Sequence, residues 1–317
     1  MRPDVATLSS ELLNGKFRAL AQAITMVERD DPESHVLLAE TYAATGRARI
    51  IGITGSPGAG KSTLVAAMTR HYRKAGKRVG IIAVDPTSPF TGGAILGDRI
   101  RMQDLYTDRG VFIRSMATRG FLGGLARATN DVVDLLDAAG FDIVLVETVG
   151  VGQDEVEVIR TVQSNVVVLV PGMGDDIQAI KAGIMEIADI FAVNKADRPG
   201  ADRTVTEVTM MMSLVDDHAE WVPPIVKTVA LQAKGIAELD AELERHREFL
   251  LTSGEMTKRR RERVRIRVEN HLKERFMDRL LGSTWTLEEY NRILDDILEK
   301  RANPHGAAAS ILDRVRF

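Results

Sequence analysis

A glycine-rich segment between an apolar run and a helical pattern constrains this chain more than any other feature. The segment Gly55–Thr63 has the sequence GSPGAGKST and matches G-x-x-x-x-G-K-[ST], a pattern that surrounds phosphate groups. It follows the β-branched run Ile50–Thr54 and precedes Leu64, Val65 and Met68 at helical spacing. Strand, loop and helix in this order predict a phosphate-binding loop, whose backbone N–H groups and helix N-terminus bind phosphate oxygens.

Individual positions of this loop have distinct expected roles. Lys61 is expected to contact the β- and γ-phosphates of a nucleotide, Ser62 to bind Mg²⁺ through its hydroxyl, and Thr63 to lie near the α-phosphate. The expected nucleotide contacts in the loop are Gly55, Ser56, Pro57, Gly58, Ala59, Gly60, Lys61, Ser62 and Thr63.

Short apolar runs alternate with helical patterns from residue 49 onward, which is typical of a parallel sheet whose strands are joined by helices. The chain is therefore predicted to be an α/β protein of the P-loop NTPase class, with a mainly parallel central sheet flanked by helices. The predicted strands are Ile50–Thr54, Val79–Val84, Phe112–Arg114, Ile143–Glu147, Val166–Val170, Ile190–Val193 and Ile225–Val229.

Helical patterns lie on both sides of this region. Residues 1–45 are predicted to form an N-terminal helical arm, with the apolar stripe Leu12, Leu13, Phe17, Leu20 and Ile24. Residues 46–235 form the predicted nucleotide-binding domain. Residues 236–317 are predicted to be a charged helical extension, whose apolar faces are larger than a monomer needs and therefore favour a homodimer.

Composition excludes several classes of function. The 317 residues contain no cysteine, which excludes disulfides, thiolate metal sites and cysteine nucleophiles. A reducing compartment is therefore expected, either the cytoplasm or, if a transit peptide was removed, an organelle matrix. The net charge of -3 gives no overall attraction to nucleic acid or to an anionic membrane. The basic run Lys258–Arg263 contains an acid and no aromatic residue, so we interpret it as a solvated helix face.

A second motif predicts which nucleotide base the chain binds. Asn194-Lys195-Ala196-Asp197 ends a predicted strand and matches the guanine-reading pattern N-K-x-D. The Asp197 carboxylate can accept from guanine N1–H and from the exocyclic amine, whereas adenine has no donor at N1. The segment after the last strand is expected to offer a backbone N–H to the guanine carbonyl. The expected guanine contacts are Asn194, Lys195, Asp197, Val229, Ala230 and Leu231.

Acidic residues near the ends of predicted strands are candidate magnesium contacts, because ligands of open parallel sheets bind at the carboxyl ends of strands. Asp85 and Glu147 each end a strand, and Asp98 lies in a glycine-rich segment. Helix capping or a salt bridge is the alternative role for each acid. Gly150 is expected to donate its N–H to the γ-phosphate, and Gln153 is one candidate for orienting water.

Together, GITGSPGAGKST, VDPTSPFTGGAILGDRIRM, ETVGVGQDE, VPGMGDDIQAIKAGI and NKAD resemble the MeaB/ArgK/MMAA family of GTPases over about residues 50–235. The long middle segments Thr91–Arg99 and Glu147–Gln153 are more specific than general GTPase patterns. The resemblance implies a dimeric G protein that binds a coenzyme-B12-dependent acyl-CoA mutase, such as methylmalonyl-CoA mutase. It implies control of adenosylcobalamin loading, protection or reactivation of the mutase, and slow GTP hydrolysis that the mutase stimulates.

Site roles are carried over from the family one residue at a time. Ser62, Asp85, Asp98 and Glu147 match the magnesium surroundings, while Asn194, Lys195 and Asp197 match the guanine site. Lys181 matches a basic residue of a mobile loop, although a solvated helix position explains it equally well. The resulting catalytic set is Lys61, Asp98, Glu147 and Lys181, with GTP or GDP and Mg²⁺ as ligands.

Three alternatives stay open from the sequence. A GTPase metallochaperone for another metalloenzyme shares the nucleotide core, but the lack of cysteine argues against it. An ArgK-type kinase of a transport protein needs a phosphate acceptor, and NKAD disfavours ATP as its donor. A GTP-binding scaffold without turnover is disfavoured by the presence of Lys61, Ser62 and Glu147. The identity of the client mutase stays open.

Overall fold

The structure is a computed structural model of the chain. It forms two compact units, Met1–Thr257 and Lys258–Phe317, and each is described by itself. The residues that the structure describes are 4–85, 102–117, 124–148, 162–172, 187–213, 220–279 and 286–313.

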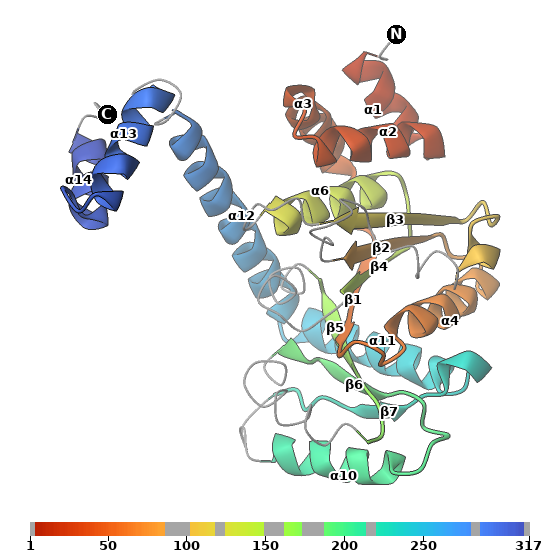
Figure 1. The fold of residues 1–317 in the computed structure, drawn as a ribbon. Helices are drawn as coiled ribbons and strands as arrows, with labels where there is room; N and C mark the ends of the chain where they lie inside the picture. The colour runs from red at the N-terminus through yellow and green to blue at the C-terminus, as the bar shows by residue number, and fades with distance from the viewer. Residues whose placement is uncertain are drawn as a thin grey trace. The chain divides into compact units, whose positions relative to one another are not determined.

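A parallel sheet of seven strands forms the centre of the first unit, which confirms the predicted fold class (Figure 1). The strand order is β3-β2-β4-β1-β5-β6-β7, so β1 lies between β4 and β5 and all carboxyl ends share one edge. The strands are β1 (Arg49–Gly55), β2 (Val79–Asp85), β3 (Val111–Ala117), β4 (Ile143–Thr148), β5 (Ser164–Leu169), β6 (Ile190–Val193) and β7 (Ile225–Lys227).

Helices account for most of the remaining described residues. In the first unit they are α1 (Val5–Leu13), α2 (Phe17–Glu28), α3 (Pro32–Thr41), α4 (Lys61–Lys74), α6 (Gly124–Ala138), α10 (Ala201–Met212) and α11 (Ile236–Thr252), with short 3₁₀ turns at Tyr42–Ala44, Gln103–Leu105 and Ala230–Gln232. Helix α12 (Glu255–Arg279) begins in the first unit and continues into the second, which also contains α13 (Leu287–Leu298) and α14 (Pro304–Asp313). Within the described ranges, none of these helices combines the length and apolar character that crossing a membrane requires.

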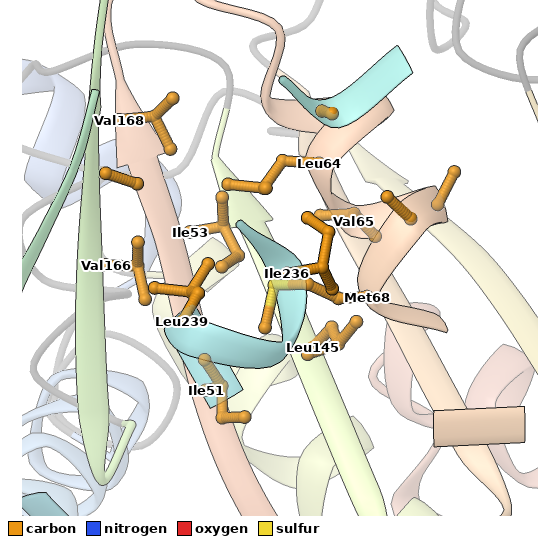
Figure 2. Close-up of a cluster of buried hydrophobic side chains, with 14 of the residues drawn as sticks. Ile51, Ile53, Leu64, Val65, Met68, Leu145, Val166, Val168, Ile236 and Leu239 are labelled. Atoms are coloured by element: carbon orange, nitrogen blue, oxygen red, sulfur yellow. The ribbon is translucent and has the colours of Figure 1, made fainter. Parts of the chain in front are cut away.

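Helices α4 and α11 cover one face of the sheet. Because side chains alternate along a strand, Ile51 and Ile53 of β1 point to this face, where Leu64 and Met68 of α4 and Leu239 of α11 surround them (Figure 2). These side chains are buried, and the same cluster includes Ala59 of the loop that joins β1 to α4. The first helix after the loop is therefore fixed to the sheet by packing.

Helices α1, α2, α3 and α6 cover the other face (Figure 1). Leu12, Leu20 and Ile24 of the predicted N-terminal stripe are buried against α6 and the strands. Leu13 is 43% exposed, because α1 ends there and Gly15, with φ of 70°, turns the chain toward α2. The stripe is therefore divided between two helices.

A buried carboxylate of α6 fixes the entry into β1. Asp137 accepts hydrogen bonds from the backbone N–H groups of Gly46, Arg47 and Ala48, at 2.5, 3.1 and 2.8 Å. Three N–H donors satisfy a charge that would otherwise be costly to bury. The contact therefore connects the N-terminal helices to the first strand of the sheet.

A serine, a histidine and an aspartate meet at the amino end of β5, far along the strands from the phosphate loop. His246 of α11 lies 2.8 Å from Ser164 Oγ through Nδ1 and 3.2 Å from Asp189 Oδ1 through Nε2. All three side chains are buried, and Trp221 packs on the imidazole at 4.8 Å between ring centroids. A hydrolytic triad needs access to substrate, so this trio is a structural link between α11 and the sheet.

Candidate nucleotide-binding site

The loop between β1 and α4 has backbone angles that favour glycine. Gly55 has φ of 142°, Gly58 of 77° and Gly60 of 91°, all in the region that side-chain-bearing residues rarely adopt. Gly60 is the N-cap of α4, so the N-terminus of that helix opens directly onto the loop. The N–H groups of the first helical turn and the helix dipole at this position favour a bound anion.

The glycines of this loop differ in how much space surrounds them, which predicts different costs of substitution. A Cβ on Gly55 would lie 2.3 Å from the Val168 carbonyl oxygen, whereas a Cβ on Gly58 would meet nothing within 4 Å. We expect Gly55→Ala to lower the free energy of unfolding by about 3–5 kcal/mol, from backbone strain plus a clash. Gly58→Ala, with strain alone, should lose about 1–2 kcal/mol. Urea unfolding measures both, and equal losses would contradict the prediction.

Lys61 supplies a positive charge inside the loop. Its ammonium group donates to the carbonyl oxygens of Gly55, at 2.6 Å, and Ser56, at 3.0 Å. The side chain is only 6% exposed, so the charge is held between the loop and the end of β1. A fixed ammonium at this position is suited to phosphate oxygens, which accept hydrogen bonds as carbonyl oxygens do and also carry negative charge.

Ser62, in the first turn of α4, meets Glu147 near the carboxyl end of β4. The Ser62 hydroxyl donates to Glu147 Oε1 at 2.7 Å, and both side chains are buried. A hydroxyl beside a carboxylate is an oxygen donor set of the kind that Mg²⁺ accepts, so these residues fit the predicted cation. The structure brings together two of the four predicted magnesium contacts.

Other predicted site residues lie outside the described part of the structure. Asp85 ends β2 opposite Ala117, but its side chain is outside the described set. Asp98, Gly150, Gln153 and Lys181 also lie outside the described residues.

Asn194 connects the guanine motif to the phosphate loop. Its Nδ2 donates to the Ala59 carbonyl at 2.9 Å, and its Oδ1 accepts from the Ala230 N–H and the Thr228 hydroxyl, each at 3.2 Å. The side chain is buried at the end of β6. The predicted guanine contacts did not include Thr228 itself, because no spacing rule relates its side chain to Asn194. One amide thus orients three segments from different parts of the chain.

The rest of the guanine motif lies beside the same loop. Lys195, with φ of 55°, donates its ammonium to the Gly58 carbonyl at 2.7 Å. The Ala196 N–H donates to the Thr228 carbonyl at 3.0 Å, which fixes the backbone just before Asp197. Asp197 itself is exposed, as is Leu231 in the turn after β7. An exposed carboxylate on a fixed backbone is suited to reading the edge of a base.

A metallochaperone, one of the alternative functions, would need a site for the metal ion that it delivers. Across the ranges that the structure describes, no group of three or more His, Asp or Glu side chains is placed to bind a metal ion. The metallochaperone alternative therefore has no cargo site within those ranges.

Comparison with known proteins identifies the family. The family model "Methylmalonyl Co-A mutase-associated GTPase MeaB" matches residues 20–284. A Pyrococcus horikoshii protein named as a GTPase is 49% identical over 318 residues, which cover 99% of each chain. The mitochondrial methylmalonic aciduria type A homolog of Caenorhabditis elegans is 34% identical over 87% of this chain and 74% of its own.

A solved structure described as a LAO/AO transport system kinase matches with a TM-score of 0.73 and 27% identity, over 99% of this chain and 98% of that one. The chain is therefore a P-loop GTPase that binds guanine nucleotide, and it belongs to the MeaB family of methylmalonyl-CoA mutase-associated GTPases.

Proposed function

We propose that this chain is a Mg²⁺-dependent G-protein chaperone of a coenzyme-B12-dependent acyl-CoA mutase. In this role its nucleotide state gates adenosylcobalamin loading and protects or reactivates the mutase. The family match over residues 20–284 carries the proposal, because the family is described by its association with methylmalonyl-CoA mutase. The buried Ser62–Glu147 contact supports the magnesium-dependent part.

Hydrolysis in this site rests on positioning and electrostatics. Lys61 and the loop N–H groups orient the γ-phosphate, and Asp197 selects guanine. Ser62 and Glu147, with Asp85 and Asp98, are the proposed contacts of Mg²⁺, which would supply positive charge to the phosphate oxygens when bound. Lys181 is proposed as a further catalytic residue and Gly150 as a donor to the γ-phosphate. Without a partner to complete the site, turnover is expected to be slow.

The second unit supports the homodimer part of the proposal. Val264, Val268 and Leu272 recur every four residues along α12 and are 40%, 52% and 63% exposed. Leu298 at the end of α13 is 78% exposed. Apolar side chains that share a helix face are suited to burial against another protein surface. We propose a cytoplasmic homodimer in which these residues are covered.

Hydrolysis assays test the proposal directly. Purified protein is given Mg-GTP or Mg-ATP, alone and with each of a panel of coenzyme-B12-dependent acyl-CoA mutases. We expect slow, GTP-selective turnover that one mutase accelerates at least about tenfold, as partner proteins do for other GTPases. GTP turnover that no mutase changes would overturn the proposed partner and leave the GTPase intact.

A kinase alternative is tested in the same assay, because one similar structure is described as a transport system kinase. With γ-labelled GTP, label released as free phosphate supports hydrolysis. Label transferred to a periplasmic binding protein would support the kinase instead.

A further inference from the structure

Two buried threonines lie next to residues of the nucleotide site without belonging to either motif. Thr54 immediately precedes Gly55 at the end of β1, and Thr148 immediately follows Glu147 at the end of β4. The Thr148 hydroxyl donates to the Thr54 hydroxyl oxygen at 3.0 Å. The two residues are 1% and 0% exposed, so the bond is shielded from water.

This bond lies where the backbone pairing between the two strands ends. The ladder between β1 and β4 runs from Arg49–Ile143 to Ile53–Glu147. On its other side, β1 stays paired with β5 as far as Gly55. The hydroxyl pair therefore extends the contact between β1 and β4 one residue beyond their last backbone pair. It does so just before the chain enters the phosphate loop.

The alternation of side chains places the threonine pair opposite the Ser62–Glu147 contact. Along β4, Leu145 packs with α4, whereas Val144 and Val146 pack with the helices of the opposite face. By the same alternation, Glu147 points to the α4 face, where it meets Ser62, and Thr148 points to the other face. The end of β4 is thus bound from both faces by buried polar contacts.

We propose that the Thr148–Thr54 hydroxyl pair is a positioning contact, which holds the end of β4 so that the Glu147 carboxylate stays against Ser62 during GTP hydrolysis. The inference rests on the proposed Mg²⁺-dependent hydrolysis at this site. A glutamate side chain has several rotatable bonds, so its carboxylate is placed accurately only when its backbone is fixed. Displacement of a catalytic group by a fraction of an ångström slows chemistry more than it weakens binding of the distant base.

Isosteric and conservative substitutions of Thr148 test the proposal in the full chain. Thr148→Val keeps the shape and removes the hydroxyl, whereas Thr148→Ser keeps the hydroxyl. We expect Thr148→Val to slow single-turnover hydrolysis of Mg-GTP about tenfold and to raise the Mg²⁺ concentration for half-maximal rate. Its affinity for GDP measured without Mg²⁺ should stay within about twofold of wild type, and Thr148→Ser should recover most of the rate.

Thr54→Val gives an independent check through a double-mutant cycle. If the two hydroxyls act as one contact, the double variant should be no slower than the slower single variant. Wild-type rate in Thr148→Val overturns the proposal, as does an equal loss of rate in Thr148→Ser. If the wild type binds but does not hydrolyse GTP, the proposed function fails. In that case the inference is tested by the Mg²⁺ dependence of GTP affinity. If Thr148→Val has the same Mg²⁺ dependence as wild type, the positioning role of the threonine pair is overturned.

Discussion

Asp197→Asn is expected to lower the affinity for GTP on the order of 10³-fold, because one hydrogen bond loses its charge and the other is lost. The same variant should prefer xanthosine triphosphate. In the proposed contact the carboxylate accepts from guanine N1–H and from the exocyclic amine, whereas an asparagine amide places a donor opposite the second position. Xanthine has a carbonyl there, so the substituted pair is again complementary.

We expect this change to leave the fold intact and to alter only the proposed base contact. Asp197 is exposed, and its backbone is held by Ala196 and Asn194 through contacts that do not involve its side chain. Competition of GTP or xanthosine triphosphate against a fluorescent GDP analogue measures which triphosphate the variant prefers. Asp202→Asn, in the exposed first turn of α10, is the control and should keep the wild-type order. Unchanged GTP preference in Asp197→Asn would remove this residue from the base site.

Glu147→Gln is expected to slow single-turnover hydrolysis of Mg-GTP by about 10²–10³-fold, the usual loss when one preorganised electrostatic contact is removed. The carboxylate is 2% exposed and lies 2.7 Å from the Ser62 hydroxyl, so a neutral amide changes the charge next to the proposed cation. GDP affinity without Mg²⁺ should change little, because the proposed guanine contacts follow β6 and β7, on the other side of β1 from β4.

A double-mutant cycle shows whether Ser62 and Glu147 act as a unit. Ser62→Ala should slow hydrolysis by a similar factor, and combining it with Glu147→Gln should add little. Glu28→Gln is the matched control, since Glu28 pairs with Arg114 of β3 and lies on α2, away from the loop. Full additivity of the two losses would show that Ser62 and Glu147 contribute separately.

The existence and type of the strands were predictable from local pattern. Strands that are buried on both faces have continuous apolar sequences, as Ile143–Thr148 does, and these stand out between polar turns. The ends were less predictable. The last strand was predicted to reach Val229 but ends at Lys227, because the Val229 N–H bonds to the Lys234 carbonyl at 3.0 Å instead of continuing the sheet. The third strand extends to Ala117, since its pairing with β2 continues past Arg114.

The phosphate loop and the guanine motif were predictable because each is a short segment with its own local geometry. Glycines at positive φ, a lysine and a hydroxyl in fixed order carry the information within a few residues. The tertiary hydrogen-bond partners of those residues could not be predicted from such short segments. No local pattern indicated that Asn194 binds the Ala59 carbonyl or that Thr228 and Thr148 take part in buried contacts.

By itself the sequence determined a P-loop protein with a parallel sheet, a guanine-type motif and resemblance to one GTPase family. Only the tertiary structure decided which side chains meet, because strand order sets which strand ends are neighbours. Ser62 and Glu147 are 85 residues apart, Thr54 and Thr148 are 94 apart, and Asn194 is 135 residues from Ala59. Periodicity reports the environment of a side chain over a few residues, whereas pairing over such separations follows from placing β1 between β4 and β5.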